Sequence, residues 1–260
     1  MTLVLFGFIA AVYIAMIVLN ETKDLFRDRF SSPLLKIVAY IWLGALMFVV
    51  SALVYLSAIA PPSAKDLSRV PFYSLFTLHA ILIIFLAGWW LLSGRPPVAQ
   101  FLNIQREEPG VAVLSGLAVG VGGWIITLTL AATIALLLQA TGVMPKNPQP
   151  SATISWLVSL PVWKKALIVL SAMTVEEAFF RGWLQKRVGL IASTALFAMA
   201  HLGLGQPLLL IGIAVISLII GFTFYRTKDL IPGVIAHGVF DAVQIFVLIP
   251  IAFKAIGTGA

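Results

Sequence analysis

The chain has 260 residues, 61% of them hydrophobic and 10% charged, with a formal net charge of +7 and no cysteine. Because an ordinary soluble domain is about 45–50% apolar and about 25% charged, this composition excludes both a soluble globular domain and a disordered chain. Without cysteine there are no disulfides and no thiol chemistry, and the basic residues lie mostly between apolar runs, with no basic stripe typical of nucleic-acid binding.

Long apolar runs follow one another along the chain, and a membrane-spanning helix needs about 20 such residues. Eight runs can be distinguished, at residues 3–19, 34–60, 71–92, 111–140, 165–183, 189–204, 207–225 and 230–256. The sequence therefore predicts an all-α, polytopic membrane protein of about eight transmembrane helices in a single domain, 1–260. Residues 1–160 supply four spans and a proline-rich loop, with at most a short interfacial helix around Trp156. Residues 161–260 supply the other four.

Ionisable residues inside a span each cost about 2.5–3.5 kcal/mol on insertion scales, so each one requires an explanation. In the first half of the chain only Lys36 and His79 fall in apolar runs. Lys36 lies near a span end, where its long side chain can reach the membrane surface. His79 stands alone, and we interpret it as a neutral imidazole that is hydrogen-bonded to a neighbouring helix.

The fifth run is different, because it contains two adjacent carboxylates and a guanidinium, Glu176, Glu177 and Arg181. At 1.5 Å per residue, the flanking Lys164 and Lys186 lie about 15–18 Å from Glu176, which places Glu176 near the middle of the bilayer. Glu177 and Arg181 are four residues apart and share a helix face, so they can form an internal ion pair. Glu176 points about 100° away from that face and has no partner on its own helix.

Two later runs carry further polar residues. His201 follows Phe197 by one helical turn, and His237 precedes Asp241 by one turn, so that each pair lies on one helix face. Asp241 could orient the imidazole of His237. The residues Pro232 and Gly233 begin this last run.

Glu176, His201, His237 and Asp241 come from three helices and predict a polar catalytic cavity in the second half of the chain. A buried glutamate can act as a general base, and histidines can donate to an oxyanion, which is sufficient to cleave an amide with water and no metal. The same four side chains could instead hold a divalent ion such as zinc. The spacing leaves both alternatives open.

The sequence lacks the motifs of several other enzyme classes. The sequence has no His-Glu-x-x-His, no Gly-x-Ser-x-Gly and no Walker-type glycine-rich loop. A transporter often shows two similar halves, whereas here all carboxylates within the spans lie in the second half.

Three short patterns occur in order on separate apolar runs: Glu-Glu-x-x-x-Arg at 176–181, Phe-x-x-x-His at 197–201 and His-x-x-x-Asp at 237–241. Together they resemble the CAAX protease and bacteriocin-processing enzyme family, which includes the Rce1-type prenyl-protein endopeptidases. The resemblance covers residues 165–245, about a third of the chain. Many prenyl-processing members carry Asn at the last position, where this chain has Asp241.

The resemblance implies an eight-helix intramembrane endopeptidase. In it Glu176 activates water beside His201, Glu177 and Arg181 are the supporting pair, and His237 with Asp241 stabilises the oxyanion. It implies no required cofactor, although the family has also been described as metal-dependent, and zinc on Glu176, His201, His237 and Asp241 remains the alternative. The expected partners are membrane lipid and a peptide or lipidated protein substrate, with no nucleic acid. The expected location is the cell membrane of a prokaryote. The alternative function is a non-catalytic membrane scaffold or a bacteriocin self-immunity protein.

Overall fold

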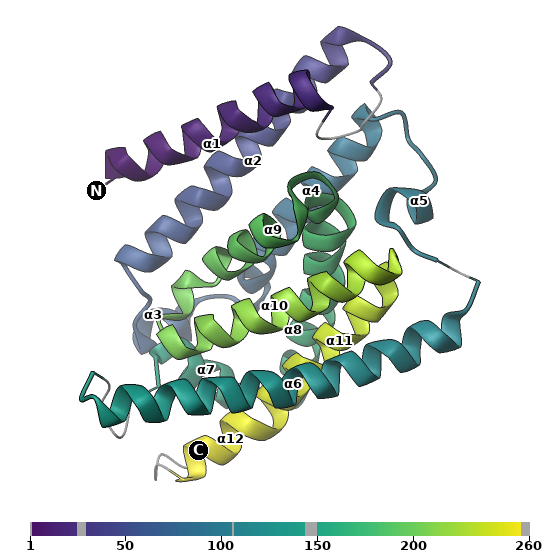
Figure 1. The fold of residues 1–260 in the computed structure, drawn as a ribbon. Helices are drawn as coiled ribbons and strands as arrows, with labels where there is room; N and C mark the ends of the chain where they lie inside the picture. Colours follow the sequence, from purple (N-terminus) through teal and green to yellow (C-terminus); the bar gives the residue numbers. More distant parts are fainter. Residues whose placement is uncertain (1, 25–29, 106, 144–149, 256–260) are drawn as a thin grey trace.

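The computed structural model describes residues 2–24, 30–105, 107–143 and 150–255 (Figure 1). Over these ranges the chain forms helices and no strand, which confirms the all-α prediction. The first half comprises α1 (Thr2–Lys23), α2 (Pro33–Ile59), α3 (Ala64–Arg69), η1 (Phe72–Phe76), α4 (Thr77–Leu92), α5 (Val98–Leu102) and α6 (Pro109–Ala140). The second half comprises α7 (Ala152–Ser159), α8 (Val162–Ser171), η2 (Ala172–Glu176), η3 (Ala178–Gln185), α9 (Lys186–Ala200), η4 (Leu202–Leu204), α10 (Pro207–Thr227), α11 (Leu230–Val243), η5 (Gln244–Leu248) and α12 (Ile249–Ala255).

Six stretches of the described chain are long and apolar enough to cross a membrane, compared with the eight runs expected from the sequence. Part of the difference arises because the single stretch 162–204 contains two expected runs, 165–183 and 189–204, between which the helix is broken. Gly189 bends the chain there at φ 81°, a left-handed conformation that glycine adopts without steric cost. The first run forms the 22-residue helix α1 but is not among the six. The polytopic membrane class is therefore confirmed, and the count of eight stays a prediction.

The expected loop at 141–163 contains one short helix, α7, which includes Trp156 as predicted. The side chain of Ser151 begins this helix by accepting a hydrogen bond from the backbone N–H of Ile154. Residues 144–149, which include two of the prolines, lie outside the described part of the chain.

An aromatic core joins the two halves of the chain. Trp89 from α4 and Trp183 from η3 are both fully buried, with their ring centroids 5.0 Å apart in an edge-to-face arrangement. Phe85 from α4 lies 4.8 Å from Trp183 in the same kind of contact. Such pairs prefer these offset geometries, so they fix how η3 lies against α4.

The long helix α6 runs across the lower part of the view in Figure 1, where it packs against α10 and α11. Glycines on α6 allow this close approach. A Cβ atom added to Gly116 would lie 2.7 Å from Cβ of Ile235, and one added to Gly120 would lie 2.8 Å from Cβ of Val239. Small residues at such crossings let helix backbones pack closely inside a membrane.

We expect Gly120→Ala to destabilise the protein by about 1–3 kcal/mol, because the added methyl would overlap the rigid Cβ of Val239 and approach the backbone oxygen of Ala236. Gly122→Ala is the matched control, since a Cβ there has nothing within 4 Å and alanine favours a helix. Thermal unfolding in detergent should show a lower melting temperature for Gly120→Ala alone. Equal melting temperatures for the two variants would contradict this packing.

Candidate active site

The segment that carries both glutamates is π-helical. After α8 the chain forms η2, which ends at Glu176, and then η3, which contains Arg181. Such wider turns are rare and occur mostly at functional sites. They change which side chains share a face, so the α-helical spacing assumed from the sequence does not hold throughout this segment.

Glu177 and Arg181 form the ion pair expected from their spacing. Oε1 of Glu177 lies 3.0 Å from Nη1 of Arg181, and the two residues are 0% and 1% exposed. Nη1 has no aligned hydrogen bond, so this contact is chiefly a charge interaction. Nη2 of Arg181 donates to the backbone oxygen of Ser217 at 3.1 Å and to its hydroxyl at 3.0 Å, which ties η3 to α10.

The same carboxylate connects η3 to α11. Oε1 of Glu177 also lies 2.8 Å from Nδ1 of His237, so His237 and Arg181 share one acceptor oxygen. Because an ionised carboxylate only accepts, Nδ1 of His237 carries the proton in this contact. The other ring nitrogen, Nε2, lies 3.4 Å from Oδ2 of Asp241, one helical turn further along α11.

Phe197 lies at the centre of this arrangement. The guanidinium carbon of Arg181 lies 4.8 Å from the ring centroid of Phe197, and the rings of His201 and His237 lie 4.7 and 5.9 Å from it. A cation above an aromatic face is attracted by the ring, and more strongly where water is excluded. One aromatic side chain of α9 thereby contacts residues of two further segments, η3 and α11, as well as the histidine at the end of α9.

Glu176 points away from this cluster, towards α4. Its Oε1 lies 3.0 Å from Nε2 of His79, and Nδ1 of His79 lies 2.6 Å from the hydroxyl of Ser171. The expected hydrogen bond of His79 to a neighbouring helix is confirmed, but His79 does not stand alone, because the helical segment that it contacts carries Glu176. The only sequence signal was an ionisable residue in an otherwise apolar span.

His201 faces the second oxygen of Glu176. Its Nδ1 contacts the backbone oxygen of Phe197 at 2.8 Å, and because a carbonyl only accepts, this nitrogen carries a proton. Nε2 of His201 lies 3.9 Å from Oε2 of Glu176, beyond hydrogen-bond distance. No described residue hydrogen-bonds to Oε2, which is buried. Two acceptor atoms thus face each other across a short gap.

The structure therefore brings the four predicted residues into two adjacent clusters. Glu176 and His201 form one together with His79, while His237 and Asp241 form the other with Glu177 and Arg181. Gly238 permits this packing, since a Cβ atom there would lie 2.6 Å from the sulfur of Met173 in η2. Asp241 and His201 are the most open members, with side chains 23% and 24% exposed.

The zinc alternative requires three or more ligands directed at one point. Within the described ranges, no three His, Asp or Glu side chains are grouped in a way that could hold a metal ion. Both ring nitrogens of His237 face carboxylates, and one oxygen of Glu176 is directed at His79. The side chains as arranged do not fit a metal, and we derive no reaction step through one.

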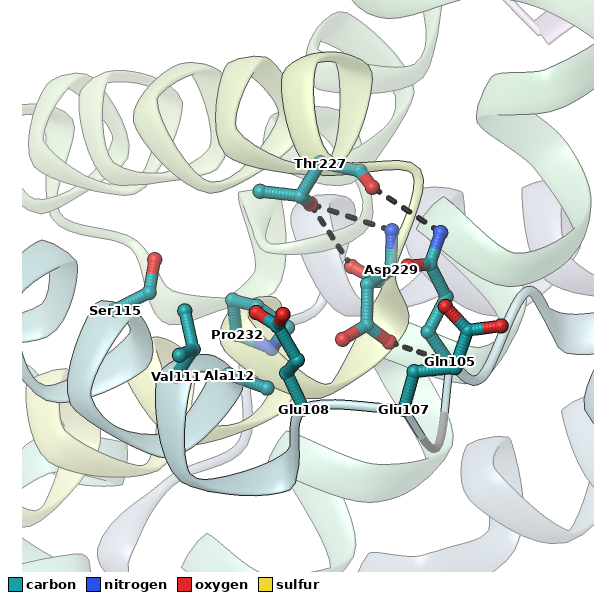
Figure 2. Close-up of a pocket in the computed structure, with 9 residues that line it drawn as sticks. All are labelled: Gln105, Glu107, Glu108, Val111, Ala112, Ser115, Thr227, Asp229 and Pro232. Carbon is teal, nitrogen blue, oxygen red and sulfur yellow. Dashed lines mark hydrogen bonds between the residues drawn. The ribbon is translucent and has the colours of Figure 1, made fainter.

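A cavity of about 170 Å³ lies elsewhere, between the start of α6 and the turn from α10 to α11 (Figure 2). Asp229 closes one side, where its Oδ1 accepts hydrogen bonds from the backbone N–H groups of Gln105 and Ile231. Its lining contains none of the candidate site residues, and consists of Gln105, Glu107, Glu108, Val111, Ala112, Ser115, Thr227, Asp229 and Pro232. The polar cavity expected around Glu176 stays a prediction.

These features define the class: a polytopic helical membrane protein with a buried carboxylate–histidine site in its second half. Residues 158–243 match the family model described as type II CAAX prenyl endopeptidase Rce1-like. The resemblance drawn from the three motifs is confirmed over this third of the chain, and it indicates a membrane protease. No curated protein and no solved structure matches the chain.

We expect Arg181→Met to destabilise the protein by about 3–5 kcal/mol, because it leaves the Glu177 carboxylate buried without its cation. Adding Glu177→Gln should recover part of that loss, since the amide is neutral. Thermal unfolding of the single and double variants in detergent measures the difference. A double variant that melts lower than Arg181→Met would show that the charge pair is not what stabilises this site.

Proposed function

We propose that the protein is an intramembrane endopeptidase of the CAAX-protease type, which hydrolyses a peptide bond with a water molecule activated by Glu176. The observation that carries the proposal is the pair of acceptors facing each other, Oε2 of Glu176 and Nε2 of His201, 3.9 Å apart. A single water can donate one hydrogen to each of two such atoms at ordinary distances of about 2.8 Å.

The hydrogen bonds of Glu176 and His201 leave each residue with one free acceptor atom, as the activation of a water molecule requires. Glu176 has one oxygen occupied by His79, so only the other is left to accept a proton. His201 has its Nδ1 proton committed to a backbone oxygen, which leaves Nε2 unprotonated in the neutral ring. A water held between them is oriented by both and loses its proton to the carboxylate as it attacks.

In the proposed reaction the water oxygen bonds to the carbonyl carbon of the scissile amide while its proton moves to Glu176. The carbonyl oxygen becomes an oxyanion. The carbon–nitrogen bond then breaks, and the proton passes from Glu176 to the leaving nitrogen. The products are a carboxylic acid and an amine, and the carboxylate of Glu176 is restored.

His237 and Asp241 are proposed to stabilise the oxyanion. Nδ1–H of His237 donates to Glu177, so the contact of 3.4 Å between Nε2 and Asp241 joins two groups that repel unless one proton lies on the pair. Whether it lies on Nε2 or on Asp241, this proton is the donor that is proposed to turn from the pair to the oxyanion, and such donors are effective where water is excluded. The proposed substrate is a peptide or lipidated protein with its cleavage site at the membrane surface.

Glu176→Gln should lower the turnover of a prenylated CAAX-type peptide by at least about 10²-fold, because the amide keeps the shape of the side chain but cannot accept a proton. The measurement is peptide cleavage by the purified protein in detergent, compared with the unprenylated peptide. Glu107→Gln, at an exposed position that is not one of the candidate site residues, is the control for charge removal. Near-normal turnover by Glu176→Gln would reject the proposed mechanism.

Asp241→Asn should retain activity, because asparagine keeps a hydrogen-bond donor next to His237. A chelator should leave the wild-type rate unchanged. If Asp241 were instead an anionic metal ligand, Asp241→Asn would lose activity, added zinc would partly restore it, and the chelator would inhibit the wild type. The same substitution therefore separates the two mechanisms.

A further inference from the structure

Three side chains from three segments lie in a line that ends at the proposed base. The hydroxyl of Ser171, at the end of α8, lies 2.6 Å from Nδ1 of His79 on α4, and Nε2 of His79 lies 3.0 Å from Oε1 of Glu176. We infer that Ser171 and His79 form a hydrogen-bonded chain that fixes the orientation of the Glu176 carboxylate, with His79 as a positioning residue. The inference deepens the proposed function and depends on it for its catalytic meaning.

The π-helical turn is what makes this chain possible. Ser171 and Glu176 are five residues apart, and in an α-helix they would point about 140° away from each other. The π-helical segment η2, Ala172–Glu176, lies between them, and its i→i+5 hydrogen bonds stack residues five apart. Both side chains consequently face α4, where one imidazole bridges them.

Hydrogen-bond logic sets the direction of the chain. A neutral imidazole has one N–H and one bare nitrogen. An ionised Glu176 can only accept, so Nε2 of His79 carries the hydrogen, and Nδ1 accepts from the hydroxyl of Ser171. Both ring nitrogens of His79 are then hydrogen-bonded. This is expected because the side chain is only 12% exposed, and buried polar groups are nearly always paired. The ring of Phe76, 6.2 Å away, lies beside the imidazole.

As a consequence, the two carboxylate oxygens of Glu176 have different roles. Oε1 is held by His79, whereas Oε2 is left directed towards His201. His79 touches neither substrate nor the attacking water in this arrangement. Its removal should therefore affect the chemical step and leave substrate binding intact.

The kinetic test uses the full-length protein and the prenylated peptide. His79→Ala should lower kcat about 10- to 100-fold with KM nearly unchanged, as expected for the loss of one hydrogen bond to a charged group. His79→Gln should recover part of that loss, because its amide can donate from the position of Nε2. Ser171→Ala should lower kcat by a smaller factor. Thr174→Val is the matched control, since it removes a hydroxyl from the same turn that bonds to backbone oxygens, those of Leu170 and Ser171, and to no side chain in the described part of the chain.

A second measurement does not need activity. The chain has three histidines, so a protein labelled with ¹⁵N-histidine gives a spectrum of three imidazoles, and the signals of His79 are those missing from His79→Gln. We expect a neutral ring with its hydrogen on Nε2. Glu176→Gln and Ser171→Ala should both shift these signals, and Thr174→Val should not.

The outcomes separate the two proposals. If the wild type cleaves no peptide, the proposed function fails, and the spectra alone decide on the hydrogen-bonded chain. If the peptide is cleaved but His79→Ala keeps its kcat, the positioning role is overturned. Hydrogen on Nδ1 of His79, or signals that do not respond to Glu176→Gln, would overturn the chain itself. Should His79→Ala fail to fold, His79→Gln and Ser171→Ala still give a result in both measurements.

Discussion

The arrangement of the second half depends on one buried charge pair, Glu177 with Arg181. A carboxylate and a guanidinium that are removed from water must each find partners, because an unpaired buried charge costs more free energy than a small membrane domain can spare. Arg181 obtains its remaining partners from Ser217 on α10, and Glu177 obtains its second from His237 on α11. Satisfying this pair therefore fixes where two further helices lie, and with them the histidine of the proposed oxyanion site.

The aromatic contacts support the same geometry from the other side. Phe197 lies next to Arg181 and to two histidines, while Trp183, two residues further along η3, packs against Trp89 and Phe85 of α4. Because α4 is held in this way, His79 is presented to Glu176 at a defined distance. The charged and aromatic contacts thus place the two clusters of the site side by side.

Helical periodicity was sufficient to predict the class of fold, the Glu177–Arg181 pair and the shared face of His237 and Asp241, since each depends on residues close in the chain. It could not predict the contact of His79 with Glu176, because 97 residues separate them and only packing brings them together. The π-helical turns were missed for a different reason: the charged residues of 172–185 mark the segment as unusual, but their spacing is equally compatible with an α-helix. The two expected spans at 165–183 and 189–204 meet at Gly189, where the backbone leaves the helical conformation.

The length of α6 has a consequence for the surrounding bilayer. Its 32 residues extend about 48 Å, whereas the hydrocarbon core of a membrane is about 30 Å thick, and no residue of the helix is charged. Such a segment fits only by inclining well beyond the usual tilt of about 20°, or by thickening the lipid around it. Since α10 and α11 pack against α6 at its glycines, we expect hydrophobic mismatch at this one helix to act on the two helices that carry Ser217 and His237, and the site to respond to membrane thickness.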